Sequence, residues 1–168
     1  LAHRVGLDAF PVEEWHRIVS VDLDGLFLMS RAALAPMIAA GRGGRIVNIA
    51  SVLGLAAMRL QSPFVAAKAG IIHLTRSMAL ELAGHGILTN AIGAGSIMTE
   101  VTKQLFYGES GSFHAHPEAF MRHISLGLPR RPEENAEALP FLACPPASYH
   151  NGPVLHLAGV GSRRSLLR

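Results

Sequence analysis

The sequence predicts an α/β layered domain built on a parallel sheet, and the order of its elements is the main evidence. Short apolar runs rich in β-branched residues alternate along the chain with longer segments of helical periodicity. Strand, helix and strand in alternation favour parallel pairing through right-handed crossovers. The strands are nearly continuous apolar runs, as is typical of strands covered on both faces.

The first helix is expected from Val12 to about Ala40, because apolar residues recur at turn spacing through this stretch. Pro11 stands at its start, where a missing N–H costs little, and Gly41 follows its end. Residues 45–50, which follow the glycine-rich turn, predict a short buried strand.

Ser62 and Pro63 are expected to open a second helix, as its cap and its first residue. This helix should run to about residue 83 and stop at the two glycines that follow, at positions 84 and 86. Residues 87–92 then predict a second strand.

A third helix should begin at Pro132 and end before Pro145-Pro146, followed by a last strand over residues 153–157. Pro140 interrupts this helix and would cost about 3 kcal/mol if it lay in the helix interior. The stretch 93–128 is irregular and rich in Gly, Ser and His, so we expect a mobile substrate lid there.

Composition limits the class of protein. The 168 residues are 49% hydrophobic and 16% charged, which excludes a disordered tail and is enough for one domain over 1–168. Cys144 is the only cysteine, so a disulfide scaffold is excluded. His114 and His116 have no third ligand at convincing spacing, and we expect no metal site.

Charge and hydropathy argue against nucleic acid and membrane partners. The 15 basic and 12 acidic residues are scattered, whereas nucleic-acid binding favours a basic stripe. The longest apolar stretch, 23–40, is broken by Asp24, Arg31 and Pro36, which argues against a membrane span. The first residues lack the pattern of a signal peptide, so we expect a soluble, cytoplasmic protein.

Polar residues gather where the predicted strands end. Ser51 follows the carboxyl end of a strand, where open α/β sheets place their ligands. Phe64 and Lys68 are four residues apart on a helix and share a face. A buried, unpaired lysine is costly, so Lys68 either serves a ligand or extends to solvent. The loop 93–99 either approaches a ligand with its backbone or forms a plain turn.

Five segments occur in a specific order: Glu13-Glu14-Trp15 with the run 21–27, the strand 44–51, Lys68-Ala69-Gly70 with residues 80–83, Thr89-Asn90 with Gly95 and Thr99, and Arg131-Pro132 with Asn151-Gly152. Over about residues 8–160 they resemble the short-chain dehydrogenase/reductase family. The resemblance implies the C-terminal strands and helices of that family's Rossmann-like, doubly wound parallel sheet.

The same resemblance assigns catalytic positions. Ser51, thirteen residues before Phe64, matches the family's serine that holds the substrate oxygen, and Lys68 matches its lysine that binds the ribose. Phe64 occupies the position of the catalytic tyrosine, and Asp22 that of the asparagine in the proton relay. A phenyl ring has no ionisable proton, and a carboxylate cannot donate as an amide does.

The resemblance also implies a cofactor, NAD or NADP, and a small carbonyl or secondary alcohol as substrate. The positions expected to contact the cofactor are Lys68, Ala50, Gly95, Ile97 and Thr99. The family's glycine-rich phosphate loop has no counterpart, so we expect the back half of a longer fold that lacks roughly three βα units, on the order of 90 residues. The first strand would then have a bare edge.

Three functions stay open at this point. The chain is an oxidoreductase of this family, impaired or inactive in this truncated form; a non-catalytic relative that acts by subunit association; or a decayed fragment. Alanine-rich faces on the helices at about 12–40 and 63–83 favour a homo-oligomer, because small residues permit close helix packing, although they could equally pack on the sheet.

Overall fold

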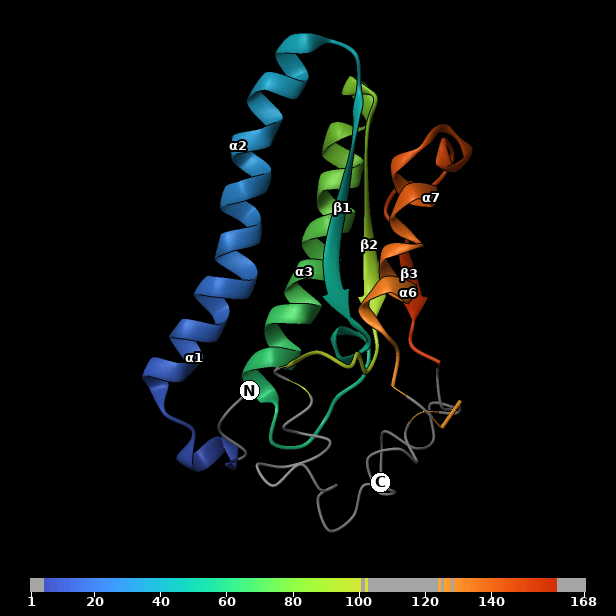
Figure 1. Cartoon of the computed structure of the whole chain (residues 1–168). Coiled ribbons are helices and arrows are strands. Elements are labelled where there is room, and N and C mark those ends of the chain that lie inside the picture. Colours follow the sequence, from blue (N-terminus) through green and yellow to red (C-terminus); the bar gives the residue numbers. More distant parts are fainter. Residues whose placement is uncertain (1–4, 101, 103–123, 125, 128, 160–168) are drawn as a thin grey trace.

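The computed structural model describes residues 5–100, 102, 124, 126–127 and 129–159 and shows a three-stranded parallel sheet flanked by helices (Figure 1). The predicted α/β class is confirmed. Most of the expected lid, 93–128, lies outside the described residues, as do Tyr107, His114 and His116. The helices are α1 (Val12–Val19), α2 (Gly25–Ala40), α3 (Ser62–Leu82), α6 (Pro132–Ala136) and α7 (Leu139–Ala143). The strands are β1 (Gly44–Ser51), β2 (Ile87–Ala94) and β3 (Val154–Leu157).

The strands lie in the order β1-β2-β3, and both pairs are parallel. In the register of β1 and β2, Gly44 lies opposite Ile87 and Ser51 opposite Ala94, so both strands end at the same edge. Within the described residues, the strand partner of β1 is β2, and β2 lies between β1 and β3.

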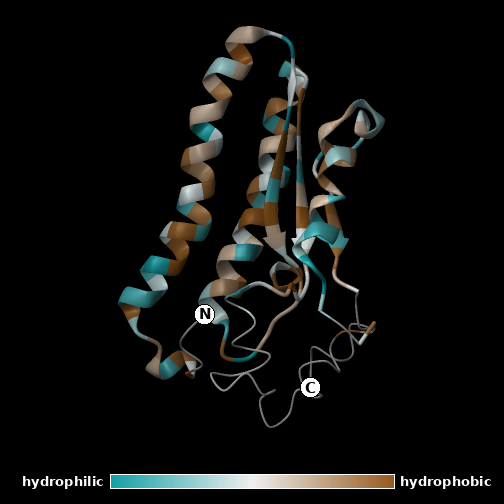
Figure 2. Cartoon of the chain, viewed as in Figure 1, coloured by the Kyte–Doolittle hydropathy of each residue, from teal (hydrophilic) through white to brown (hydrophobic). Residues whose placement is uncertain are grey.

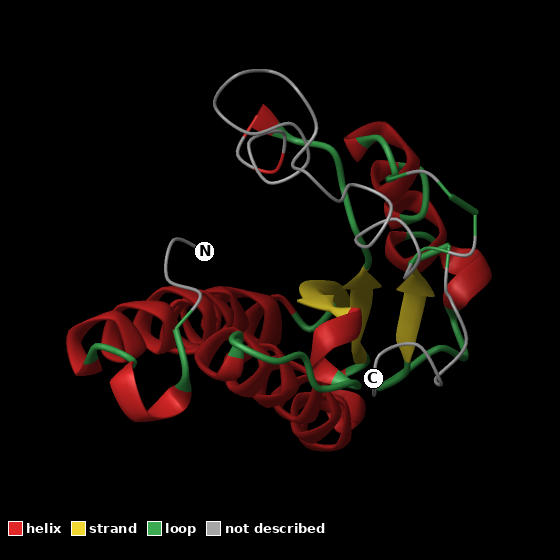
Figure 3. Cartoon of the chain, turned by 90° about the horizontal axis from the view of Figure 1, so that it is seen from below, coloured by secondary structure: helices red, strands yellow, loops and turns green. Residues whose placement is uncertain are grey.

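Among the helices, α3 makes the most extensive contact with the sheet. The long helix α3 packs on β1 and β2, and α7 contacts β1 (Figures 1 and 3). Two apolar clusters fill the interface with α3: one joins Ala50 and Ala91 to Ile71 and Ile72, and the other joins Met78 and Leu82 to Ile87. These buried side chains fix α3 against the sheet through the hydrophobic effect.

The expected helix over 12–40 is one continuous helical stretch, but it contains a turn that the periodicity does not predict. Between α1 and α2, residues Ser20–Asp24 form a π-helix, with the wider spacing of i→i+5 hydrogen bonds. The stretch ends at Gly41, whose φ of 62° is the left-handed conformation that glycine adopts most readily.

Two details of the predicted helices are wrong. Ser62 is the first residue of α3 rather than its cap; Gln61 precedes it, and Pro63 lies in the first turn. The third helix is two short helices, α6 and α7, and Pro140 lies in the first turn of α7. The interior cost expected for Pro140 does not arise there, because the first N–H groups of a helix have no intrahelical partner.

Close backbone approach holds the segment after β1 against α3. A short 3₁₀ turn, η3 (Val52–Gly54), follows Ser51 directly. A Cβ at Gly54 would lie 2.6 Å from the carbonyl oxygen of Lys68, so only glycine allows this contact. Gly54 thus brings the end of β1 next to the part of α3 that carries Lys68.

Gly54→Ala is expected to lower the free energy of unfolding by about 1–3 kcal/mol, because the added methyl group must displace backbone atoms of α3. Urea unfolding measures the change. Gly84→Ala is the matched control, since nothing lies within 4 Å of its Cβ position. Equal stabilities for the two variants would contradict the contact.

Candidate active site

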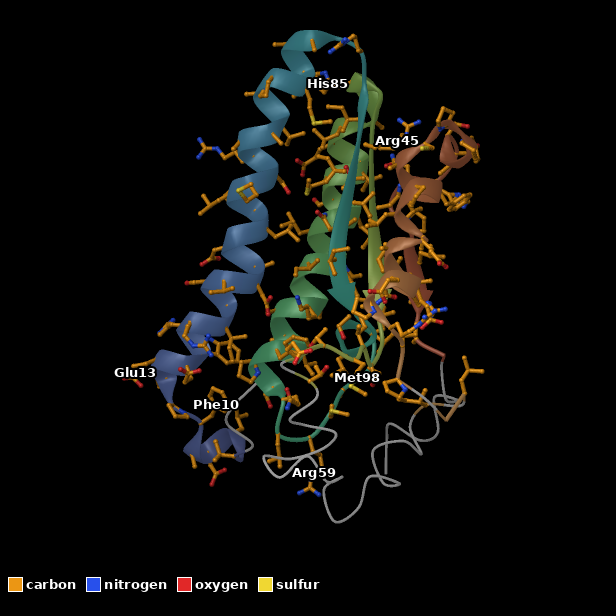
Figure 4. The ribbon with its side chains drawn as sticks, viewed as in Figure 1. Phe10, Glu13, Arg45, Arg59, His85 and Met98 are labelled. Atoms are coloured by element: carbon orange, nitrogen blue, oxygen red, sulfur yellow. The ribbon has the colours of Figure 1, made fainter. Side chains whose placement is uncertain are left out.

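The candidate site lies where β1 and β2 end, beside the N-terminal half of α3. The last residues of the two strands, Ser51 and Ala94, are register partners. Figure 4 shows Met98, which follows β2, at this end of the sheet, whereas Arg45 and His85 lie at the opposite end. The carboxyl edge of a parallel sheet is where α/β proteins bind their ligands.

Ser51 is nearly buried, with 9% of its surface exposed. Its hydroxyl donates to the carbonyl oxygen of Ala94 at 3.3 Å and accepts from the amide of Leu53 at 3.2 Å. The first of these bonds is long for a hydroxyl donor, so rotation of the hydroxyl toward a substrate oxygen would forfeit little.

A buried side-chain bond fixes the strand that carries Ser51. Asn48, three residues earlier on β1, donates from Nδ2 to Oγ1 of Thr75 on α3 at 2.9 Å. The Thr75 hydroxyl in turn donates to the carbonyl oxygen of Ile71 at 2.7 Å. Buried polar groups that are satisfied in this way fix the register of strand against helix. Asn48 and Thr75 are positioning residues that the sequence reasoning missed.

Lys68 is paired with a carboxylate, which argues against the alternative that its side chain extends to solvent. Its ammonium group, Nζ, donates to Oδ1 of Asp22 at 3.0 Å. The side chains are 13% and 25% exposed, respectively, so Lys68 does not extend freely into solvent. An ammonium and a carboxylate at this distance form a charge-assisted hydrogen bond, which offsets much of the cost of burying the lysine.

Phe64 occupies the face of α3 next to this ion pair. The Lys68 ammonium lies 5.4 Å from the centroid of the Phe64 ring, within the range of a cation–π contact. Residues 64 and 68 therefore share a face, as their spacing predicts. The face of the Phe64 ring can contact a cation, but the ring has no ionisable proton.

Of the positions expected to contact a cofactor, Ala50 has a core side chain, packed with Ile71 and Ala91. Only its backbone remains for a ligand. Gly95 has a packing role as well: a Cβ there would lie 2.6 Å from the Cα of Ala158, which follows β3. Glycine at 95 is thus required by the neighbouring segment, whether or not a ligand approaches.

Thr99 and Ile97 share one partner, Thr102. The Thr102 hydroxyl oxygen lies 2.6 Å from the carbonyl oxygen of Ile97, to which it donates, and accepts from the amide of Thr99 at 2.6 Å. The amide of Thr102 donates back to Oγ1 of Thr99 at 3.2 Å. The two threonines form a reciprocal cap like a capping box, and the spacing Thr-x-x-Thr is the sequence signal that could have found it.

The described part of the chain does not meet the requirements of a membrane-spanning helix or of a metal site. No helix there is both long and apolar enough to cross a membrane. No three His, Cys, Asp or Glu side chains within those same residues are grouped as ligands for a metal ion.

Comparisons with known proteins agree with one another. A family model described as enoyl-(acyl carrier protein) reductase matches residues 3–159. A 3-oxoacyl-(acyl-carrier-protein) reductase of Vibrio harveyi is 37% identical over 147 residues, covering 88% of this chain and 57% of that protein. The chain therefore spans little more than half the length of this relative.

Solved structures show the same likeness. An acetoin dehydrogenase from Enterobacter cloacae is 35% identical, with a TM-score of 0.78 over 92% of this chain and 58% of its own. A gluconate 5-dehydrogenase from Burkholderia cenocepacia, solved with NADP and tartrate, is 31% identical, with a TM-score of 0.83 over 93% of this chain and 59% of its own.

Proposed function

The chain belongs to the short-chain dehydrogenase/reductase family of oxidoreductases, and from this premise we propose that it forms the catalytic half of an NAD- or NADP-dependent enzyme. The proposed substrate is a small carbonyl compound or secondary alcohol. The observations that carry the proposal are the contact of Lys68 with the Phe64 ring and the close approach of Gly54, three residues after Ser51, to the backbone of α3 at Lys68.

The residues present fit the nicotinamide-ribose part of such a cofactor. Lys68 has three N–H donors, and the bond to Asp22 uses one, which leaves two for ribose hydroxyls. Ile97 and Thr99 are the proposed contacts of the nicotinamide amide, and Ala50 and Gly95 are proposed to contribute backbone. The cofactor, when bound, would supply or accept a hydride at the substrate carbon.

Proton transfer is where this chain departs from the family. Ser51 can hold the substrate oxygen by a hydrogen bond, since its bond to Ala94 is long. The group at position 64 would give the oxygen its proton, and the Phe64 ring has none. A missing general acid costs typically 10²–10⁴-fold in rate. We propose that the site binds and orients a substrate but turns it over slowly.

Phe64→Tyr is expected to raise turnover at least tenfold in a chimera that joins a relative's glycine-rich nucleotide-binding half to this chain, because it restores a general acid. Oxidation of NADPH with a small ketone measures the rate. Phe141→Tyr adds the same phenol at a half-exposed ring elsewhere and serves as the control. A rate unchanged by Phe64→Tyr would contradict the role of position 64.

A specific observation favours a second function, subunit association. Three consecutive apolar side chains on α2 are exposed: Phe27 by 47%, Leu28 by 57% and Met29 by 73%. Figure 2 shows hydrophobic residues along much of α2. Large apolar side chains on one exposed helix are typical of a protein–protein contact. We propose a homo-oligomer through the helices at about 12–40 and 63–83.

Sedimentation velocity of the purified chain is expected to show a dimer or larger species, and Leu28→Glu is expected to shift it toward monomer, because a charge in an apolar contact is costly. Tyr149→Glu is the control, since Tyr149 is fully exposed and lies outside these helices. A monomer at high concentration would exclude the association.

A further inference from the structure

We infer that Asp22 is the counter-charge of Lys68, and that this ion pair withholds from position 64 the positive charge that would otherwise acidify a proton donor there. The catalytic significance of the inference rests on the proposed function. Its evidence is the geometry of the Asp22, Lys68 and Phe64 side chains. Asp22 would act on the reaction only through Lys68, as a positioning residue.

Asp22 and Lys68 form an ion pair between two distant segments of the chain. Lys68 Nζ lies 3.0 Å from Asp22 Oδ1, and the two residues are 46 positions apart in the chain. Lys68 on α3 contacts the Phe64 ring, and Asp22 on the π-helix contacts Lys68. Both side chains are mostly buried, so water and salt screen the pair only in part.

The packing of the π-helix against α3 brings Asp22 close to Lys68. Asp22 lies in the π-helix over Ser20–Asp24, and this segment packs directly on α3. Leu23, the next residue, packs on Gly70 of α3, where a Cβ would lie 2.9 Å from Cδ2 of Leu23. Glycine at 70 therefore permits the close approach of the two segments that brings Asp22 to Lys68.

Asp22 weakens the positive potential that Lys68 alone would create at position 64. A lone ammonium within about 4–6 Å favours ionisation of a phenol, typically lowering its pKa by one to three units. The carboxylate 3.0 Å from that ammonium has the opposite effect on the same phenol. At position 64 the pair acts as a dipole rather than as a full charge, so much of the lowering is lost. The two departures at Asp22 and Phe64 therefore fit each other. The Phe64 ring has no ionisable proton whose pKa must be lowered, and the Asp22 carboxylate neutralises the Lys68 charge that would lower it.

The test uses this chain alone and needs no cofactor. A phenol is introduced by Phe64→Tyr, and its ionisation is followed by the near-ultraviolet absorbance of the phenolate as pH rises. The unsubstituted chain gives the baseline for Tyr107 and Tyr149. Adding Asp22→Asn to Phe64→Tyr is expected to lower the phenol midpoint by about one pH unit, because the lysine charge is then uncompensated.

The matched control adds Asp24→Asn to Phe64→Tyr. Asp24 belongs to the same π-helix, but its carboxylate is exposed and accepts from Ser20 Oγ at 3.3 Å. This substitution removes one negative charge from the same segment and is expected to leave the phenol midpoint within a few tenths of a unit.

Three results would overturn the inference. Equal midpoints for Asp22→Asn and Asp24→Asn would mean that Asp22 does not govern the charge at position 64. A midpoint that stays unchanged when Lys68→Gln is added to the Phe64→Tyr, Asp22→Asn chain would also overturn the inference. The lysine charge would then have no effect on ionisation of the phenol. If Asp22→Asn unfolds the chain by circular dichroism, Asp22→Glu must restore both the fold and the parent midpoint, and its failure overturns the inference too. A failed proposed function, by contrast, would leave all these midpoints as expected.

Discussion

The candidate site depends on one interaction, the ion pair that joins Lys68 on α3 to Asp22 on the π-helix. A partly buried ammonium without a partner is costly, and removing one member of such a pair leaves the other uncompensated. The pair also links the helix before β1 to the helix after it, because α3 packs on the sheet and the π-helix packs on α3. The position of the Lys68 ammonium over the Phe64 ring follows from both contacts.

Small residues make this arrangement sterically possible. Gly54 lets the turn after Ser51 lie on the backbone of α3. Gly70, which belongs to α3, lets the side chain of Leu23 approach that helix. The buried bond from Asn48 to Thr75 then holds β1 in place against α3. Together these contacts fix Ser51, Phe64 and Lys68 on rigid elements rather than on loops, as a preorganised site requires.

Much of this could be predicted from sequence, because the signals are local. The strands follow from β-branched runs, and the stop at Gly41 follows from a left-handed conformation that glycine favours. The shared face of Phe64 and Lys68 follows from helical spacing. The break between α6 and α7 was missed because Pro140 suits either a kinked helix or the start of a new one.

The rest could not be predicted, because it depends on contacts between distant segments. The π-helix over Ser20–Asp24 keeps helical dihedral angles and changes only its hydrogen bonding, so apolar periodicity does not reveal it. The partner of Lys68 lies 46 residues away, and its identity depends on how closely Gly70 lets two helices approach.

The most direct test of this account is a double-mutant cycle on the ion pair. Urea unfolding of the Asp22→Asn, Lys68→Gln and doubly substituted chains gives the coupling free energy between the two side chains. The account predicts that the double substitution costs less than the sum of the single ones, by about 1 kcal/mol or more. Additive effects, within about 0.3 kcal/mol, would mean that Asp22 and Lys68 do not act as a pair.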